Sequence, residues 1–325
     1  MSSAATFEKQ VFQIGLVRRL ERWLTAMPHP PLVVEISATH VAAARWGSGH
    51  GNLESFAAES IPFGAVVPSP LEPNVAQPDE VKSALRRVFS RVAPSAGIAL
   101  LIPDPVVRVF ILPFDTLPRR SDEALPLLRW RLKKSVPFDV DETVVSWMRQ
   151  SGRDGNLEVV TAVARQRIIR EYEDLAGALG AGPGVVMSST LATLPLLEHR
   201  GATLLVRMCG KSLTTVIVQG VNLCVYRSTE MPGDAATLDP QAMLDEIFPA
   251  VAYHQDTWGG TVDRVRVAGL GQREGIFRRA LEEELKCAVG SLAESEAALA
   301  IGSHAKDLMH QDLDALVGWN LNGGS

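Results

Sequence analysis

The chain has 325 residues, a formal net charge of -5 and 46% hydrophobic residues. Its length predicts roughly two domains, its apolar content is sufficient for a substantial core, and its charge gives no support for nucleic-acid binding. It contains no apolar run of about 18 residues that could span a membrane, and its first residues lack the pattern of a secretory signal. Three cysteines without metal-ligand spacing, Cys209, Cys224 and Cys287, indicate free thiols in a reducing compartment. We therefore expect a soluble cytoplasmic protein.

Residues 1–28 are predicted to form a separate amphipathic helix. Between residues 7 and 24, apolar side chains recur at helical intervals and basic side chains lie on the remaining surface. Three prolines, Pro28, Pro30 and Pro31, end the pattern. Packing against its own domain, docking to a partner and lying on a membrane surface are three interpretations that stay open for this helix.

The next region is predicted to be a three-stranded meander. Its strands are expected at 32–36, 41–46 and 53–60. The first turn, residues 37–40, follows an apolar strand that carries Glu35. This layout could hold a nucleotide and a metal, and it is also that of an ordinary β-hairpin. A proline-rich loop over 62–78 and a helix over 79–92 follow.

Residues 95–180 are predicted to form a compact α+β unit. Two buried strands, at 97–102 and 106–113, are expected to pair around a Pro-Asp-Pro turn. A helix capped by Ser121 is expected next. Two further strands and a helix that ends at Gly180 complete the unit.

Residues 202–230 repeat the strand–turn–strand–turn–strand pattern of the first meander. Val34 and Ile36 match Val206 and Met208 at a constant spacing, and the first turn falls on Gly210. A repeat of this length predicts a duplicated core. We therefore assign 31–94 and 181–200 to a first half and 201–325 to a second half, in which a helix near 238–258, a strand and a helix over about 273–286 follow the meander.

Four stretches together resemble the PilM family of type IV pilus assembly proteins, within the actin-like ATPase superfamily. The resemblance covers about residues 31–300 and rests on order and spacing. It is more distant to the cytoplasmic part of the type II secretion protein GspL and to the cell-division protein FtsA. It implies an α/β, actin-like (ribonuclease H-like duplicated) fold with an inserted α+β subdomain and a cleft between two halves. The stretches are VVEISATHVAAARW, LPRRSDEALPLLRWRLKKSVPFDVDETVVSW, LLVRMCGKSLTTVIVQGVNLCVYRSTEMP and LDEIFPAVAYHQDTWGGTVDRVRVAGLGQREGIFRRALEEEL.

The chain departs from the family at the phosphate turns that the resemblance implies. Glu35 and Ser37 stand where the family has Asp and Gly, and Arg207 stands where it has a second Asp. Arg207 could pair with a phosphate, or it could fill the space of Mg²⁺. Glu246 lies in the helix that would reach a ribose, but Pro249 replaces its basic companion. If the site is retained, the candidate nucleotide-binding residues are Glu35, Ser37, Thr39, His40, Arg207, Gly210, Lys211, Ser212, Glu246, Gly269 and Gly271.

Other chemistry has little support in the sequence. The seven histidines show no metal-ligand spacing, and no nucleophile elbow is present. Gly210-Lys211-Ser212 resembles the end of a P-loop, but Leu205 occupies the position of its first glycine. We therefore expect no metal, no catalytic residue and either no cofactor or ATP or ADP. The basic segment 119–134 around Trp130 could stack on nucleic acid, although a solvated helix face or a partner surface fits better.

The resemblance implies a scaffold that binds the cytoplasmic tail of an inner-membrane, PilN-type protein. In the family this tail lies in a groove between the first half and the inserted subdomain, here lined by parts of 80–92 and 95–165. Trp130, Val88 and Phe89 are the candidate partner-binding residues. Pilus motor or platform proteins and a homo-oligomeric ring are further implied partners, and no nucleic acid is expected.

Two alternatives compete with the scaffold. An active actin-like ATPase or kinase would bind Mg-ATP in the cleft with Glu35 as its metal-side carboxylate. It would need an acid in each half, and Arg207 stands in place of the second. A GspL-type protein would need a transmembrane helix near the C-terminus, and the last residues do not contain one. We therefore expect a scaffold with a degenerate nucleotide site.

Overall fold

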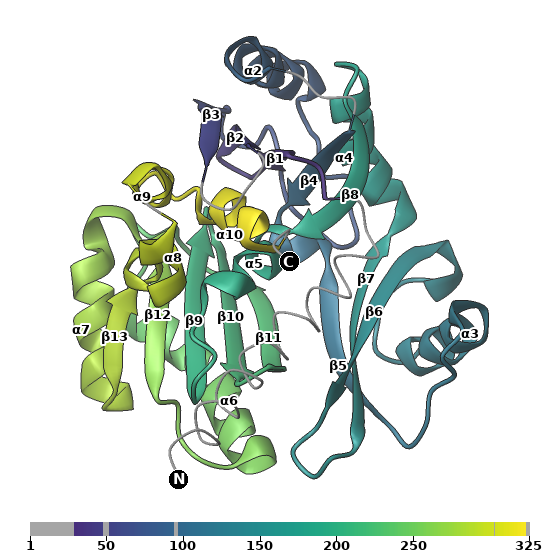
Figure 1. Ribbon diagram of the computed structural model, residues 1–325, viewed down its shortest axis with the longest axis vertical. Coiled ribbons are helices and arrows are strands. Elements are labelled where there is room, and N and C mark those ends of the chain that lie inside the picture. Colours follow the sequence, from purple (N-terminus) through teal and green to yellow (C-terminus); the bar gives the residue numbers. More distant parts are fainter. Residues whose placement is uncertain (1–28, 48–51, 94–96, 302, 323–325) are drawn as a thin grey trace, which may run out of the picture.

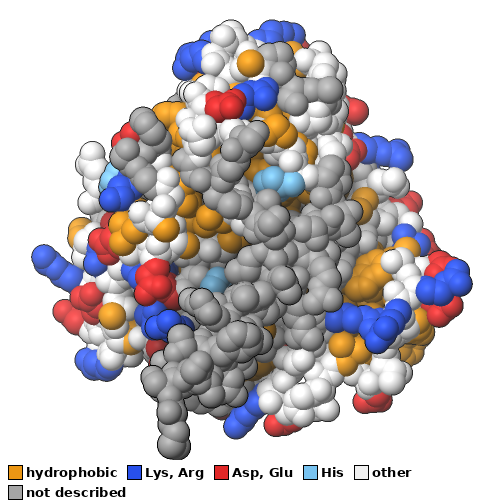
Figure 2. Space-filling model, viewed as in Figure 1, with side chains coloured by type: hydrophobic (Ala, Val, Ile, Leu, Met, Phe, Trp, Pro, Cys, Tyr) orange, Lys and Arg blue, Asp and Glu red, His pale blue; other side chains and the backbone are white. Residues whose placement is uncertain are grey.

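A computed structural model describes residues 29–47, 52–93, 97–301 and 303–322. The helix predicted for residues 1–28 lies outside this part of the chain. The described strands form two five-stranded sheets and one three-stranded sheet (Figure 1). On the face seen in Figure 2, acidic and basic side chains are interspersed around the margin.

The first five-stranded sheet has the order β3-β2-β1-β4-β8. Its meander strands are antiparallel, and β4 and β8 are added in parallel. Helices α2 and α4 pack against one face of this sheet. The five residues of β1 are all buried, as expected for an apolar central strand that is covered on both faces. The elements are β1 (Leu32–Ile36), β2 (His40–Trp46), β3 (Leu53–Ser60), α2 (Pro78–Arg91), β4 (Gly97–Ile102), α4 (Gln166–Gly177) and β8 (Gly182–Ser188).

The second five-stranded sheet repeats this plan in the order β11-β10-β9-β12-β13. Its meander occupies the same edge, its other two strands are parallel, and helices α6 and α7 supply its outer core. The predicted duplication is therefore confirmed. The elements are β9 (Ala202–Cys209), β10 (Ser212–Gln219), β11 (Asn222–Glu230), α6 (Pro240–Trp258), β12 (Arg264–Ala268), α7 (Glu274–Leu285) and β13 (Ala288–Ser291).

The inserted unit is an antiparallel sheet in the order β5-β7-β6, packed against helix α3. The expected pairing of strands 97–102 and 106–113 is wrong. Strand β4 lies between β1 and β8, so 97–102 belong to the first half, while β5 pairs with β7. A single turn, η1 (Asp104–Val106), carries the chain between the two sheets. The elements are β5 (Arg108–Phe114), α3 (Ser121–Leu132), β6 (Thr143–Ser151) and β7 (Leu157–Arg165).

Burial explains this correction. Five consecutive residues of β4, 98–102, are buried, whereas most of β5 is only half-buried. A strand that is buried on both faces is typical of the interior of a parallel sheet. The connection between β4 and β5 is so short that the sequence contains no sign of the change from one sheet to another. Ser121 is also not the cap of α3. It is the first helical residue, and Arg120 occupies the cap position without a side-chain hydrogen bond.

The C-terminal segment returns to the first half, although the sequence analysis assigned it to the second. Helix α10 (Asp314–Asn322) packs against α5 (Ser189–Thr193) and β1 between the two large sheets (Figure 1). The Trp319 indole Nε1–H donates to the carbonyl of Pro30, and its ring stacks on His29. Two short helices, α8 (Glu296–Ala300) and α9 (Ser303–Met309), precede it. Among the described residues, no helix has the length and apolar character needed to cross a bilayer.

Candidate functional site

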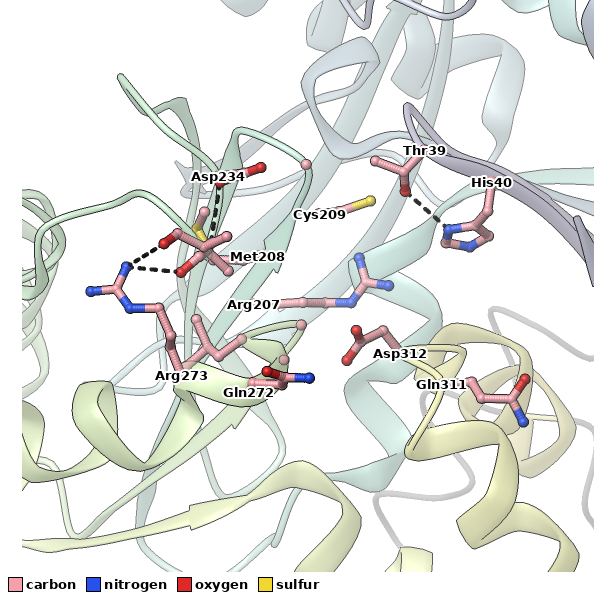
Figure 3. A pocket seen from close by; sticks show the side chains of 16 residues that line it. Thr39, His40, Arg207, Met208, Cys209, Asp234, Gln272, Arg273, Gln311 and Asp312 are labelled. Atoms are coloured by element: carbon pink, nitrogen blue, oxygen red, sulfur yellow. Dashed lines mark hydrogen bonds between the residues drawn. The ribbon is translucent and has the colours of Figure 1, made fainter. Parts of the chain in front are cut away.

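The turns after β1 and β9 face each other across a cavity of about 530 Å³ (Figure 3). A Cβ placed on Gly210 would lie 3.6 Å from the Cβ of Ala38, which shows how closely the turns approach. The cavity lining includes both predicted candidates and residues that the sequence did not point to. The predicted ones are Thr39, His40, Arg207, Gly210, Gly269 and Gly271. The others include Asp234, Gln272, Arg273, Gln311 and Asp312.

The first turn uses its own donors internally. The hydroxyl oxygen of Ser37 accepts hydrogen bonds from the backbone N–H groups of Thr39 (3.2 Å) and His40 (2.9 Å). The Ser37 N–H in turn donates to the His40 carbonyl. A phosphate-binding turn would direct such N–H groups at the anion. Here Ser37 closes the turn as an ordinary hairpin connection instead.

Arg207 extends from β9 into a cluster of three buried carboxylates. Its Nε lies 2.7 Å from Oδ2 of Asp314, its Nη2 3.6 Å from Oε1 of Glu35, and its Nη1 3.7 Å from Oδ2 of Asp104. All four side chains are at most 3% exposed. The guanidinium therefore neutralises protein acids, and its charge is not free for a phosphate.

Asp104 was missed by the sequence analysis and is the best-connected acid of the cleft. It accepts hydrogen bonds from the Thr190 N–H (2.9 Å) and hydroxyl, and from the hydroxyl of Ser188. The hydroxyls of Thr214 (2.9 Å) and Tyr226 (3.1 Å) also donate to it. Such a set of donors holds a carboxylate in one position.

Burial and neighbouring charge act on these groups in opposite directions. Burial raises the pKa of Asp314, and the adjacent Arg207 offsets only part of that rise. For Glu35, burial alone would raise the pKa, but hydrogen bonding and charge from His40, together with Arg207 and Ser189, lower it below its usual value. The hydroxyl of Ser189 donates to Oε1 of Glu35 at 2.6 Å. Glu35 is therefore held as a carboxylate beside the Arg207 guanidinium and the His40 ring.

The opposite wall of the cavity is also held by internal contacts. Gly269, directly after β12, has φ +71°, and a Cβ there would lie 1.8 Å from the Met208 carbonyl oxygen, so this turn can lie so close to the end of β9 only with glycine. The Arg273 guanidinium donates to the carbonyls of Ala235, Ala236 and Leu238. The guanidinium groups of both arginines that line the cavity, Arg207 and Arg273, contact other residues of the chain; Nη1 of Arg207 makes an ion pair with Asp104 without a hydrogen bond.

Five predicted candidates lie outside the cavity lining: Glu35 and Ser37, described above, and Glu246, Ser212 and Lys211. Oε1 of Glu246 lies 2.7 Å from Nη2 of Arg227 and accepts from the Thr229 hydroxyl. Ser212 pairs with the hydroxyl of Ser228, and Lys211 is exposed. Glu246 is therefore tied to β11, which explains its presence without a ribose.

A second hollow, of about 280 Å³, lies between the first half and the inserted unit. It is lined by β8 residues 183–188 and by parts of β6, β7 and α4, with Val144, Val107 and Leu191 among the apolar side chains. We call this hollow the groove; of the lining that the sequence predicted, parts of 95–165 contribute and 80–92 do not. Trp130 is 71% exposed on α3, Phe89 is half-buried, and Val88 is fully buried in the core, so Val88 is not accessible to a partner.

Comparisons with known proteins identify the fold. No protein-family model matches the chain, and no curated protein does. Among solved structures, the chain is similar to a chain of the "PilM-PilN type IV pilus biogenesis complex", with a TM-score of 0.71 and 16% identity over 91% of this chain and 99% of the other. A weaker similarity, with a TM-score of 0.47 and 12% identity over 73% and 80%, is to the cytoplasmic domain of EpsL, an inner-membrane component of the type II secretion system of Vibrio cholerae.

A Bacteroides thetaiotaomicron protein of unknown function with an actin-like ATPase fold is also similar, with a TM-score of 0.47 and 9% identity over 85% and 96%. The chain thus has the actin-like ATPase fold, with two mixed α/β sheets and a small inserted antiparallel sheet, and resembles PilM in structure.

The cleft residues do not fit the metal–nucleotide that this fold implies. Arg207 lies among the three carboxylates that would otherwise face a cation. Within the described ranges, no group of three or more His, Cys, Asp or Glu side chains is arranged to hold a metal ion.

Proposed function

We propose that this chain is a PilM-like scaffold of a type IV pilus assembly machine. It binds the cytoplasmic tail of an inner-membrane, PilN-type partner and does not turn over nucleotide. The observation that carries the proposal is the apolar groove between the first half and the inserted unit. The similarity to a chain of the PilM–PilN complex supports the choice of partner.

The groove suits an extended peptide because two outer strands border it. In the described residues, β8 pairs only with β4, and β6 pairs only with β7. Six consecutive residues of β8 line the groove. Successive side chains of a strand point to opposite faces, so a run of this kind indicates that the groove follows the strand's edge. An added strand would satisfy the unpaired backbone groups at such an edge.

The side chains of the groove define the chemistry of the tail. Val144 is 46% exposed and, with Val107, Val186 and Leu191, gives an apolar lining. Glu173 is the charged residue among the lining side chains that the structure describes. We expect the bound segment to carry apolar side chains and a basic group that reaches Glu173.

Binding of such a tail would hold the protein at the cytoplasmic face of the inner membrane. A ring of copies and contacts with pilus motor or platform proteins are part of the same proposal. The exposed Trp130 on α3 is its candidate second contact, because aromatic side chains flanked by arginine dominate many interfaces.

The test is a calorimetric titration with the tail peptide of the PilN-type protein from the same genome. Val144→Asp would place a charge in the apolar groove and should abolish or greatly weaken binding. Ile276→Asp is the matched control, because Ile276 is 52% exposed on α7 and lies outside the groove lining. If the wild-type protein does not bind the peptide, or if both variants lose binding equally, the proposed function is wrong.

A further inference from the structure

We infer that Arg207 is an internal cation that takes the place of a metal–nucleotide in the cleft and locks the two halves together. In a fold that closes around a ligand, the ligand joins the halves by contacting both. Here the contacts across the cleft are made by the side chains of the chain itself.

The origin of the four charged groups supports a lock. Arg207 belongs to β9 of the second half. Glu35 lies on β1, Asp104 directly follows β4, and Asp314 begins α10, which packs against the first half. One cation from one half therefore meets three anions from the other, so separating the halves would separate buried opposite charges.

The hydrogen bonds of Asp104 cross the same boundary. Ser188 and Thr190 donate to it from the first half, and Thr214 and Tyr226 donate from β10 and β11 of the second. Opening the cleft would leave this carboxylate without two of its donors in a buried setting, which is unfavourable.

The charge of the cavity disfavours a nucleotide. In its lining, Asp234 and Asp312 outnumber Arg273, and around the buried guanidinium of Arg207 lie three acids, Glu35, Asp104 and Asp314. For Arg207 to pair with a phosphate it would have to leave Asp314, and the buried acids would lose their counter-charge. The geometry thus favours filling of the metal space over pairing with phosphate, the two roles that the sequence left open.

This inference is independent of tail binding, because it concerns a different part of the molecule and has its own measurements. The first is the melting temperature of the wild-type protein with Mg²⁺, with ATP and with both at millimolar concentrations. No shift is expected, because a ligand raises the melting temperature only if it binds the folded state. A clear upward shift with Mg-ATP would overturn the inference.

The second measurement is amide hydrogen exchange in Arg207→Ala, compared with Arg266→Ala. Arg266 is the control, since its Nε lies 2.9 Å from Oε1 of Glu198 in a partly buried ion pair that does not line the cavity. Loss of the lock should accelerate exchange at the start of α10 and in the turn after β1 for Arg207→Ala only. Equal patterns in the two variants would contradict a lock.

Arg207→Lys keeps the inference testable if Arg207→Ala does not fold. Lysine keeps the positive charge but cannot extend several donors toward separate carboxylates. We expect exchange at the start of α10 to be faster in Arg207→Lys than in the wild type. If Arg207→Lys exchanges its amide hydrogens at the same rates as the wild type throughout, the several contacts of the guanidinium do not hold the halves together. That result would overturn the inference.

Discussion

The cleft and the groove both lie between two units of the molecule, but they differ in how their side chains are engaged. In the cleft, Arg207 is surrounded by acids and Ser37 binds the N–H groups of its own turn. In the groove, the lining is mostly apolar and two strand edges are unpaired within the described residues. Polar groups that already have partners gain little from a ligand, whereas unpaired edges and exposed apolar surface gain from being covered. The difference supports the two proposals made above, a cleft joined by the charges of the chain itself and a peptide bound in the groove.

The largest expected effect comes from removing the cation of the cleft. Arg207→Ala should lower the free energy of unfolding by about 3–5 kcal/mol, because it leaves buried carboxylates without a counter-charge. Urea denaturation of this variant beside Arg266→Ala measures the difference. Arg266 is 17% exposed, so Arg266→Ala should lower the free energy of unfolding by less than Arg207→Ala does. If Arg207→Ala lowers the free energy of unfolding by less than about 1 kcal/mol, as for a surface ion pair, the charges of the cleft do not hold it together, and the contrast with the groove fails.

The next effect concerns Gly269, which allows the turn after β12 to lie against the end of β9. Gly269→Ala should destabilise the protein by about 2–4 kcal/mol, because it combines a left-handed backbone with a clash on the Met208 carbonyl. Gly271→Ala is its control, with a similarly positive φ of +52° but open space around the added Cβ, and should lose about 1 kcal/mol. Equal losses in thermal denaturation would mean that the close approach of the strands contributes nothing.

A smaller effect is expected in the groove, on binding alone. Val144→Asp should weaken the tail peptide at least about tenfold, or about 1.4 kcal/mol, with little change in stability because Val144 is half-exposed. Calorimetry measures the effect on affinity, and a melting curve on the same sample measures the effect on stability. Trp130→Ala in the same assay shows whether α3 takes part. An unchanged affinity for Val144→Asp would move the binding site elsewhere.

The smallest effect is a pH dependence that arises in the cleft. The pKa of Glu35 is lowered from its ordinary value of 4.5; burial opposes this shift, while His40 and Arg207 cause it. A lowered pKa contributes stability above pH 4.5 that is lost as the pH falls through the folded-state value. Glu35→Gln should therefore lose less stability on acidification than the wild type, measured by urea midpoints at neutral and acidic pH. The raised pKa of Asp314 acts in the opposite sense but is present in both proteins. A larger acid-induced loss in the variant would contradict this assignment.

The sequence predicted the regular parts of the fold for physical reasons. Both meanders follow from alternating or continuous apolar runs that are separated by turn residues, and the repeat of this unit predicted two matched sheets. It did not predict that β4 and β5 enter different sheets, because a turn of three residues gives no sign of the change.

The candidate site was predicted only in part. The positions of Glu35, Arg207 and the glycines are local to the turns, and the structure brings them to the cleft. Two of the three acids around Arg207, Asp314 and Asp104, could not be foreseen. Asp314 is 107 residues away in sequence and lies in a tail without a clear pattern. Asp104 looked like part of a proline-rich turn. Long-range ion pairs depend on tertiary packing, which local periodicity does not encode.

The most direct test of the account is the affinity of the wild-type protein for the tail peptide, measured by calorimetry with and without Mg-ATP. Coupling between two sites requires that both ligands bind. If the cleft is held by Arg207 and recognition lies in the groove, the peptide binds with the same affinity, within about twofold, in both conditions. Failure to bind in either condition, or a change in affinity of about tenfold on addition of Mg-ATP, would contradict it.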